Sequence, residues 1–203
     1  MSSTATRPYR QVARAAATEE TRRRIAAAFA GALETGWIED ITLDDVAAAA
    51  GTTRQTVIRL FGGKEGLLSD WAERMNEEVM TRRALRPGDG PRAAVHAVLQ
   101  DYEAIGDMIL RLLAQEGRYA PLSTMLDRGR GWHRDWVAKA FATELAARPP
   151  RAREALLDQL VVATDVFTWK LLRRDRGRSR AETEARMAGL IAGVLQEGDD
   201  RDG

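Results

Sequence analysis

The chain has no cysteine, only six prolines, and aromatic residues at just 6% of its 203 positions. The lack of cysteine excludes a disulfide framework and thiolate chemistry at a metal or an active site. Long apolar runs are missing too, because no segment approaches the ~20 residues that a membrane-spanning helix needs. Residues Met1–Arg14 lack the apolar core of a signal peptide. We therefore expect a cytoplasmic protein that makes no contact with membranes.

A surplus of one charge is also absent. Thirty-one lysines and arginines nearly cancel thirty aspartates and glutamates, which leaves a formal net charge of +1. This balance excludes a protein that coats nucleic acid through bulk positive charge, but it leaves room for a local basic site. Any DNA binding would then depend on specific contacts and on dimerisation.

Alanine, by contrast, is abundant, at 34 positions. Strand-forming residues never gather into alternating runs, and every proline falls at a plausible helix boundary, so the pattern predicts an all-α fold. The expected helices span residues 18–35, 43–49, 54–61, 64–83, 91–104, 107–116, 121–146, 152–174 and 179–196.

Two of these helices are short and are joined by a tight turn that contains Gly51. Thr42 is the expected N-cap of the first, with Asp45 three residues on, and Thr53 is the expected N-cap of the second. Short helices joined in this way are the sequence form of a helix-turn-helix unit.

The second of these helices carries Arg54, Gln55, Ile58 and Arg59 on the face opposite its apolar side. Arginine and glutamine can bond bidentately to guanine and adenine in the major groove, and isoleucine can meet a thymine methyl group. Hydroxyls in the neighbouring loops can reach phosphates. The residues alone leave a second interpretation open, a helical hairpin with a solvated charged face.

The stretch Ile41–Leu68, ITLDDVAAAAGTTRQTVIRLFGGKEGLL, resembles the DNA-binding signature of TetR/AcrR-type transcriptional regulators. Its ending, FGGKEGLL, is the most specific part of the match, and a looser likeness extends over about residues 18–196. The resemblance implies a homodimeric, ligand-responsive regulator, most often a repressor, that binds a palindromic operator in double-stranded DNA. In that family the lysine that opens the fourth helix contacts a phosphate, a role that falls here to Lys64. The residues expected to contact DNA are Thr42, Thr52, Thr53, Arg54, Gln55, Ile58, Arg59 and Lys64.

Two positions depart from the family pattern. Ile58 stands where the family usually has a tyrosine that donates a hydrogen bond to a phosphate, and Leu60 stands where a histidine is common. We expect a weaker phosphate contact there, unless Arg59 or the arginines before residue 18 replace it. Those arginines are equally explained as a solubilising tail.

With this resemblance, the expected organisation has five parts. These are a flexible basic arm (1–17), a helix-turn-helix DNA-binding domain (18–63), a linking helix (64–83), an effector-binding and dimerisation domain (91–196), and a disordered tail (197–203).

The last two expected helices carry more apolar residues than one subunit's core requires, which favours pairing with a second copy. The alternative is that both helices only cover the core of their own chain. The residues expected at the dimer interface are Leu160, Thr164, Phe167, Leu171, Ala188, Ile191, Ala192 and Leu195.

Large aromatic and methionine side chains concentrate after Pro91 and suggest a cavity for a small, largely apolar effector. The alternative is that they are ordinary core residues. The residues expected at the effector site are Trp71, Met75, His96, Tyr102, Met108, Met125, Trp132, Trp136 and Phe167.

No catalytic motif, metal-ligand spacing or phosphate-binding loop is present, so we expect no enzyme activity, no metal and no cofactor. Asp101, Glu103, Asp107 and Glu116 are interpreted as solvated carboxylates. The competing functional hypothesis is a helical ligand-binding or interaction protein whose DNA-reading helix has degenerated.

Overall fold

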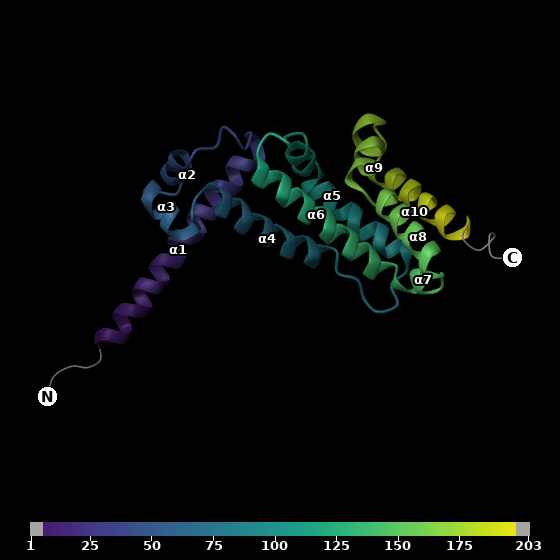
Figure 1. The fold of residues 1–203 in the computed structure, drawn as a ribbon, viewed down its shortest axis with the longest axis horizontal. Helices are drawn as coiled ribbons and strands as arrows, with labels where there is room; N and C mark the ends of the chain where they lie inside the picture. Colours follow the sequence, from purple (N-terminus) through teal and green to yellow (C-terminus); the bar gives the residue numbers. More distant parts are fainter. Residues whose placement is uncertain (1–5, 198–203) are drawn as a thin grey trace. The chain divides into compact units, whose positions relative to one another are not determined.

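The structure is a computed structural model that describes residues 6–197, with side chains from residue 11 onward. All regular structure in this range is helical, which confirms the all-α prediction (Figure 1). The helices are α1 (Thr6–Thr35), α2 (Leu43–Ala49), α3 (Arg54–Phe61), α4 (Lys64–Arg82), α5 (Pro91–Leu113), α6 (Ala120–Ala140), α7 (Ala142–Ala146), α8 (Pro150–Ala163), α9 (Val166–Lys170), the π-helical segment η1 (Leu171–Asp175) and α10 (Arg180–Glu197).

Several helix boundaries differ from the sequence prediction. Helix α1 begins at Thr6 rather than at residue 18, so the described part of the predicted arm is helical. The two helices predicted between residues 91 and 116 form one continuous α5. Residues 1–5, and 198–203 of the predicted tail, lie outside the described range.

Two long predicted helices are interrupted, each at a fully buried residue. Phe141 leaves helical geometry (φ −115°, ψ 28°) and separates α6 from α7. Thr164 ends α8, and the carboxylate of Asp165 then accepts the backbone N–H of Phe167 at 2.8 Å to cap α9. These breaks depend on packing and capping in three dimensions, which apolar periodicity does not encode.

The chain divides into two compact units. Unit 1 holds the described residues up to Arg74 together with Gln115–Met125, and unit 2 holds Met75–Ala114 and the described residues from Leu126 onward. In unit 1, Ile25, Phe29 and Leu33 form an apolar seam along α1 and are buried. Val46 of α2 and Val57 of α3 are also buried in this unit.

The core of unit 2 is formed by α5, α6, α8, α9 and α10. Helix α5 packs against α9 and α10, and α10 packs against α8. At the α5–α9 contact, a Cβ on Gly106 would lie 2.5 Å from the ring of the fully buried Trp169. Glycine at this position therefore allows the close approach of the two helices.

Candidate nucleic-acid interface

The α2–α3 pair has the caps that its sequence predicts. The Thr42 hydroxyl accepts the backbone N–H of Asp45 at 3.1 Å, and the Thr53 hydroxyl accepts that of Thr56 at 3.3 Å. Gly51 (φ 60°) lies in the turn between α2 and α3, and Gly62 (φ 79°) forms the left-handed C-cap of α3. Both ends of the eight-residue α3 are therefore satisfied locally.

The predicted reading face of α3 is open to solvent. Arg54, Gln55, Ile58 and Arg59 are all exposed, and Ile58 keeps 44% of its surface accessible. Val57 and Phe61, on the other side of the helix, are buried. Ile58 is therefore an apolar side chain that a partner can contact. Of the loop threonines, Thr42 and Thr53 are exposed and Thr52 is half-buried.

Arg54 has a partner within the unit. Its guanidinium lies 3.1 Å from the carboxylate of Asp44 on α2, and both side chains are more than half exposed. An exposed pair of this kind is worth about 0–1 kcal/mol, so a guanine or a phosphate can displace Asp44 at little cost.

The base of the motif is held by residues that the sequence analysis did not single out. Arg22 of α1 donates to the carbonyl of Leu60 at 2.9 Å and to Asp70 of α4 at 2.8 Å, and its guanidinium lies 4.5 Å from the Phe61 ring centre. Arg22 therefore ties the end of α3 to α1 and α4. The sequence shows the bulky Phe61 and the opposite charges of Arg22 and Asp70. It does not show that Arg22 pairs with Asp70, because the two lie 48 residues apart.

Lys64, the predicted phosphate contact, is half-buried at the start of α4. Its Nζ donates to the carbonyl of Glu39 at 3.2 Å. Burial lowers the pKa of Lys64, while the nearby carboxylates of Asp40 and Glu39 act in the opposite direction. The ammonium is thus held in place before any DNA is bound.

The structure does not bring the predicted effector residues together. Trp71 and Met125 belong to unit 1, where Trp71 is buried. His96 is exposed and pairs with Glu184 at 3.1 Å, and Phe167 is 56% exposed, so the prediction that these two line an interior site is wrong. Met75, Met108 and Trp132 are half-buried, and only Tyr102 and Trp136 of the set are buried in unit 2.

Tyr102 and Trp136 both contact Arg83, a residue that the sequence analysis missed. The Arg83 guanidinium is 5% exposed and lies 4.9 Å from the Tyr102 ring centre and 5.3 Å from that of Trp136. It donates to Asp101 at 2.7 Å, and Arg82 donates to the other oxygen of the same carboxylate at 2.7 Å. Asp101 is fully buried, so its interpretation as a solvated carboxylate is wrong. Its spacing from Ala94 and Val98 on the apolar face of α5 could have revealed its burial.

His133, which is half-buried, completes this cluster. Because arginine only donates, Arg83 donates to His133 Nδ1 at 3.0 Å, and His133 Nε2–H then donates to the hydroxyl of Thr164 at 3.2 Å. Burial and the Arg83 charge lower the pKa of His133 to about 3. Tyr102 donates to the carbonyl of Thr164 at 3.1 Å, and burial raises its pKa to about 12. His133 is therefore a neutral imidazole and Tyr102 a neutral phenol over the physiological pH range.

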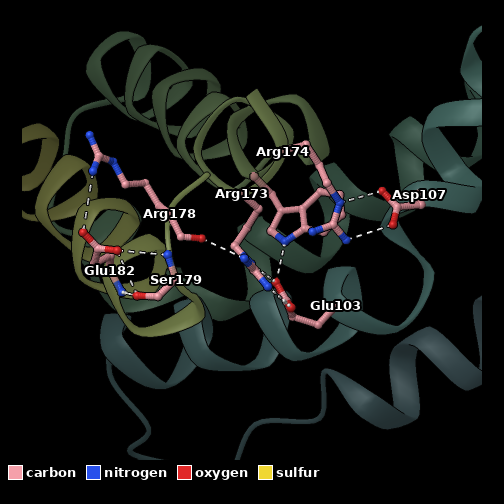
Figure 2. Close-up of polar contacts among 8 residues, drawn as sticks. Glu103, Asp107, Arg173, Arg174, Arg178, Ser179 and Glu182 are labelled. Atoms are coloured by element: carbon pink, nitrogen blue, oxygen red, sulfur yellow. Dashed lines mark hydrogen bonds and ion pairs between the residues drawn. The ribbon is translucent and has the colours of Figure 1, made fainter. Parts of the chain in front are cut away.

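A second polar cluster fixes η1 and the start of α10 (Figure 2). Arg173 forms two bonds to Glu103 of α5 at 2.6 and 2.8 Å, and Arg174 forms two to Asp107 at 2.9 and 2.8 Å. The hydrogen bonds from Arg173 are the main cause that lowers the pKa of Glu103 to about 2. A capping box starts α10, since the Glu182 carboxylate accepts the backbone N–H of Ser179 at 2.9 Å and the Ser179 hydroxyl accepts that of Glu182 at 3.2 Å.

The predicted dimer residues divide into two groups. Leu160, Thr164 and Ile191 are buried in the core of their own chain, so the prediction that they contact a partner is wrong. Ala188 and Leu195 are half-buried, and Ala192 is exposed. The large apolar residues exposed in unit 2 are Val162, Phe167, Leu171 and Leu190. An open groove of about 630 Å³ on this unit is lined by Leu172, Arg186, Gly189, Leu190, Gly193 and Val194.

Membrane-spanning and metal-binding features are both absent from the described residues. Within residues 6–197, no helix is both long and apolar enough to cross a membrane. The same part of the chain contains no group of three or more His, Asp or Glu side chains that could hold a metal ion.

Comparison with known proteins assigns the fold and the motif. Residues 25–70 match the family model described as bacterial regulatory proteins, tetR family. No curated protein matches the chain in sequence. A tetR-family transcriptional regulator from Streptomyces coelicolor has a similar structure, with a TM-score of 0.68 at 19% identity over 90% of this chain and 85% of its own.

Two other solved structures are similar. A transcriptional regulator from Rhodococcus sp. Rha1 gives a TM-score of 0.65 at 18% identity, over 87% of this chain and 97% of its own. NalD, the secondary repressor of the MexAB-OprM multidrug efflux pump in Pseudomonas aeruginosa, gives 0.58 at 18% identity, over 88% of this chain and 96% of its own. At these identities the likeness concerns the fold.

Proposed function

We propose that this chain, whose residues 25–70 match the family model of tetR bacterial regulatory proteins, is a homodimeric repressor that binds a palindromic operator. The observation that carries the proposal is the exposed face of α3, with Arg54, Gln55, Ile58 and Arg59 presented on a helix that is capped at both ends. In this arrangement α3 enters the major groove, where Arg54 and Gln55 read guanine and adenine and Ile58 contacts a thymine methyl group. Thr42, Thr52, Thr53, Arg59 and Lys64 contact the DNA backbone.

A second copy is the partner that suits the apolar surface of unit 2. Phe167, Leu171 and Leu190 are each more than half exposed, which is costly in a protein that stays monomeric. Gly189 and Gly193 lie four residues apart on α10 and let another helix approach closely. A dimer formed through this surface would present two α3 helices to successive major grooves, about 34–36 Å apart.

The dimer proposal is tested by sedimentation equilibrium of the wild-type protein and of Leu190→Arg. The wild type should sediment as a dimer and the variant as a folded monomer. Gln100→Arg, at an exposed polar position of α5, is the matched control and should remain dimeric. A wild-type protein that stays monomeric at high concentration would contradict the proposal.

We also propose that a small, largely apolar effector binds in unit 2 and lowers the affinity for DNA. The support is the number of aromatic and methionine side chains in this unit, of which Met75, Met108 and Trp132 are half-buried. Such an effector acts through α4, whose residues belong to both units. It must bind the DNA-free state more tightly, and a coupling free energy of about 1–3 kcal/mol is typical.

DNA reading is tested by selecting duplexes from a random-sequence library and by footprinting the DNA that flanks the coding gene. The selected sites should be palindromic. Arg54→Ala with Gln55→Ala should abolish the preference for the selected site without lowering thermal stability. The matched control is Arg176→Ala with Gln100→Ala, which removes the same exposed residue types from unit 2.

The alternative function, a helical ligand-binding protein with a degenerate reader, is favoured only by Ile58, which cannot donate the hydrogen bond of the usual tyrosine. That alternative predicts weak DNA binding without sequence preference, even at low salt. Steep salt dependence at a selected palindrome would instead support the regulator.

A further inference from the structure

The segment Gln115–Met125, between α5 and the body of α6, is part of unit 1 although it lies far beyond the helix-turn-helix motif in the sequence. It contacts the loop between α1 and α2, residues 36–42, and the first residue of α4. None of its side chains was expected to take part in DNA binding.

Gln115 is the first residue of this segment and is fully buried. Its side-chain oxygen accepts the backbone N–H of Ile38 at 2.6 Å. Ile38 is itself fully buried and lies in the loop, so this N–H has no partner in a helical ladder. Leaving it unsatisfied would cost about 1–3 kcal/mol, and Gln115 therefore fixes the backbone of the loop.

The next residues form a closed turn over the same loop. Gly117 has a φ of 86°, and its N–H donates to the hydroxyl of Ser123 at 3.1 Å. Arg118 lies over the Trp37 ring at 4.8 Å and 3.8 Å from the carboxylate of Glu39. Arg118 thus contacts Trp37 and Glu39 of the loop, and Glu39 is the residue whose carbonyl accepts from Lys64.

Tyr119 brings the segment to Lys64. The Lys64 Nζ lies 5.5 Å from the Tyr119 ring centre, within the range of a cation–π interaction, while it donates to the carbonyl of Glu39 at 3.2 Å. The bond to Glu39 uses one of the three N–H donors of an ammonium, which leaves two for a phosphate. The aromatic face and the carbonyl together restrict where Nζ can lie.

We propose that Tyr119 is a positioning residue for DNA binding, which holds the Lys64 ammonium in place for a backbone phosphate through the face of its ring. This inference rests on the proposed DNA-binding function and adds a determinant that lies outside the helix-turn-helix.

The test compares Tyr119→Phe, which keeps the aromatic face, with Tyr119→Leu, which keeps apolar bulk without a π face. Full-length proteins are titrated, by fluorescence anisotropy over a series of KCl concentrations, with a duplex selected by the wild type from a random-sequence library. Tyr119→Leu should weaken binding about 5- to 20-fold, since a dimer carries two Lys64 side chains, and Tyr119→Phe should bind like the wild type. Thermal unfolding of each variant reports whether it is folded, and Tyr119→Met replaces the leucine variant if that one unfolds.

A double-mutant cycle distinguishes positioning from a structural role. Lys64→Ala should lower the salt slope by about 0.9 for each phosphate that the side chain no longer neutralises, and Tyr119→Leu should weaken binding no further in the Lys64→Ala background. Independent effects that multiply would overturn the proposal, as would equal weakening by Tyr119→Phe and Tyr119→Leu. If Lys64→Ala binds like the wild type, this inference fails while the proposed function stands. If the wild type selects no duplex, the proposed function fails and this inference falls with it.

Discussion

Units 1 and 2 place their charged side chains in opposite ways. In unit 1 the Arg54–Asp44 pair lies on the surface, with 60% and 66% of its side chains exposed. In unit 2 the Arg83–Asp101 pair has 5% and 0% exposed and is enclosed by Tyr102 and Trp136. A surface pair exchanges partners at little cost, whereas breaking a buried pair leaves a charge without compensation.

The comparison shows that each unit is suited to a different task. Unit 1 has the short capped helix α3, on whose exposed face Arg54 is free to leave one partner for another. Unit 2 has an interior in which Tyr102, Trp136 and His133 already use their polar atoms in hydrogen bonds to Arg83 or Thr164. An effector that enters this interior must therefore replace existing hydrogen bonds, and the cluster would rearrange as a whole.

Asp101→Asn should produce the largest effect, because it leaves the buried guanidinium of Arg83 without a carboxylate and leaves Arg82 with only Glu78. We expect the free energy of unfolding to fall by about 3–5 kcal/mol, measured in urea by tryptophan fluorescence. Asp44→Asn, the corresponding change in the exposed pair, should cost within about 1 kcal/mol and should not weaken DNA binding. Similar destabilisation by the two variants would contradict the contrast between the units.

Acidification should destabilise unit 2 through His133. Its pKa is about 3 in the folded chain and about 6.5 when unfolded, so the folded state holds the neutral imidazole. The contribution is complete above pH 6.5 and is lost as the pH falls toward 3, by roughly 2–3 kcal/mol at about pH 4.5. His133→Gln should flatten urea-unfolding stability between pH 6.5 and about 5.

Gly106→Ala should strain the contact between α5 and α9, since its Cβ would lie 2.5 Å from the Trp169 ring. We expect a destabilisation of about 1–3 kcal/mol, from overpacking of a fully buried side chain. Gly131→Ala on α6 has no heavy atom within 4 Å of the added Cβ and should instead stabilise the protein by about 0.5–1 kcal/mol. Differential scanning calorimetry of the two variants compares them directly, and a stabilised Gly106→Ala would show that the helices separate easily.

Thr53→Ala should destabilise the protein less than Asp101→Asn, by about 0.5–2 kcal/mol, because it removes the N-cap of α3 in unit 1. Hydrogen exchange should detect the weakened cap at the start of α3, and unit 2 should be unaffected. Thr53→Ser keeps the capping oxygen and should exchange like the wild type. Faster exchange throughout unit 2 would indicate that the two units do not unfold separately.

Contacts between residues that are close in the sequence were predicted, whereas contacts between residues far apart in the sequence were missed. The caps at Thr42 and Thr53, and the exposed face of α3, depend on residues within one or two turns and were predicted. Asp101 was misinterpreted because its partners are 18 and 19 residues away and the pairing depends on how α5 packs. Gln115 and Tyr119 carried no local signal, since their partners lie 77 and 55 residues earlier in the chain.

The sequence by itself determined the all-α class, the helix-turn-helix and the family resemblance, because helix periodicity, caps and turns are encoded over a few residues. The tertiary structure decided which apolar residues face solvent and which carboxylates are buried. It also decided which side chains support Lys64. These properties depend on long-range packing, where a side chain's environment is set by elements that are distant in the chain.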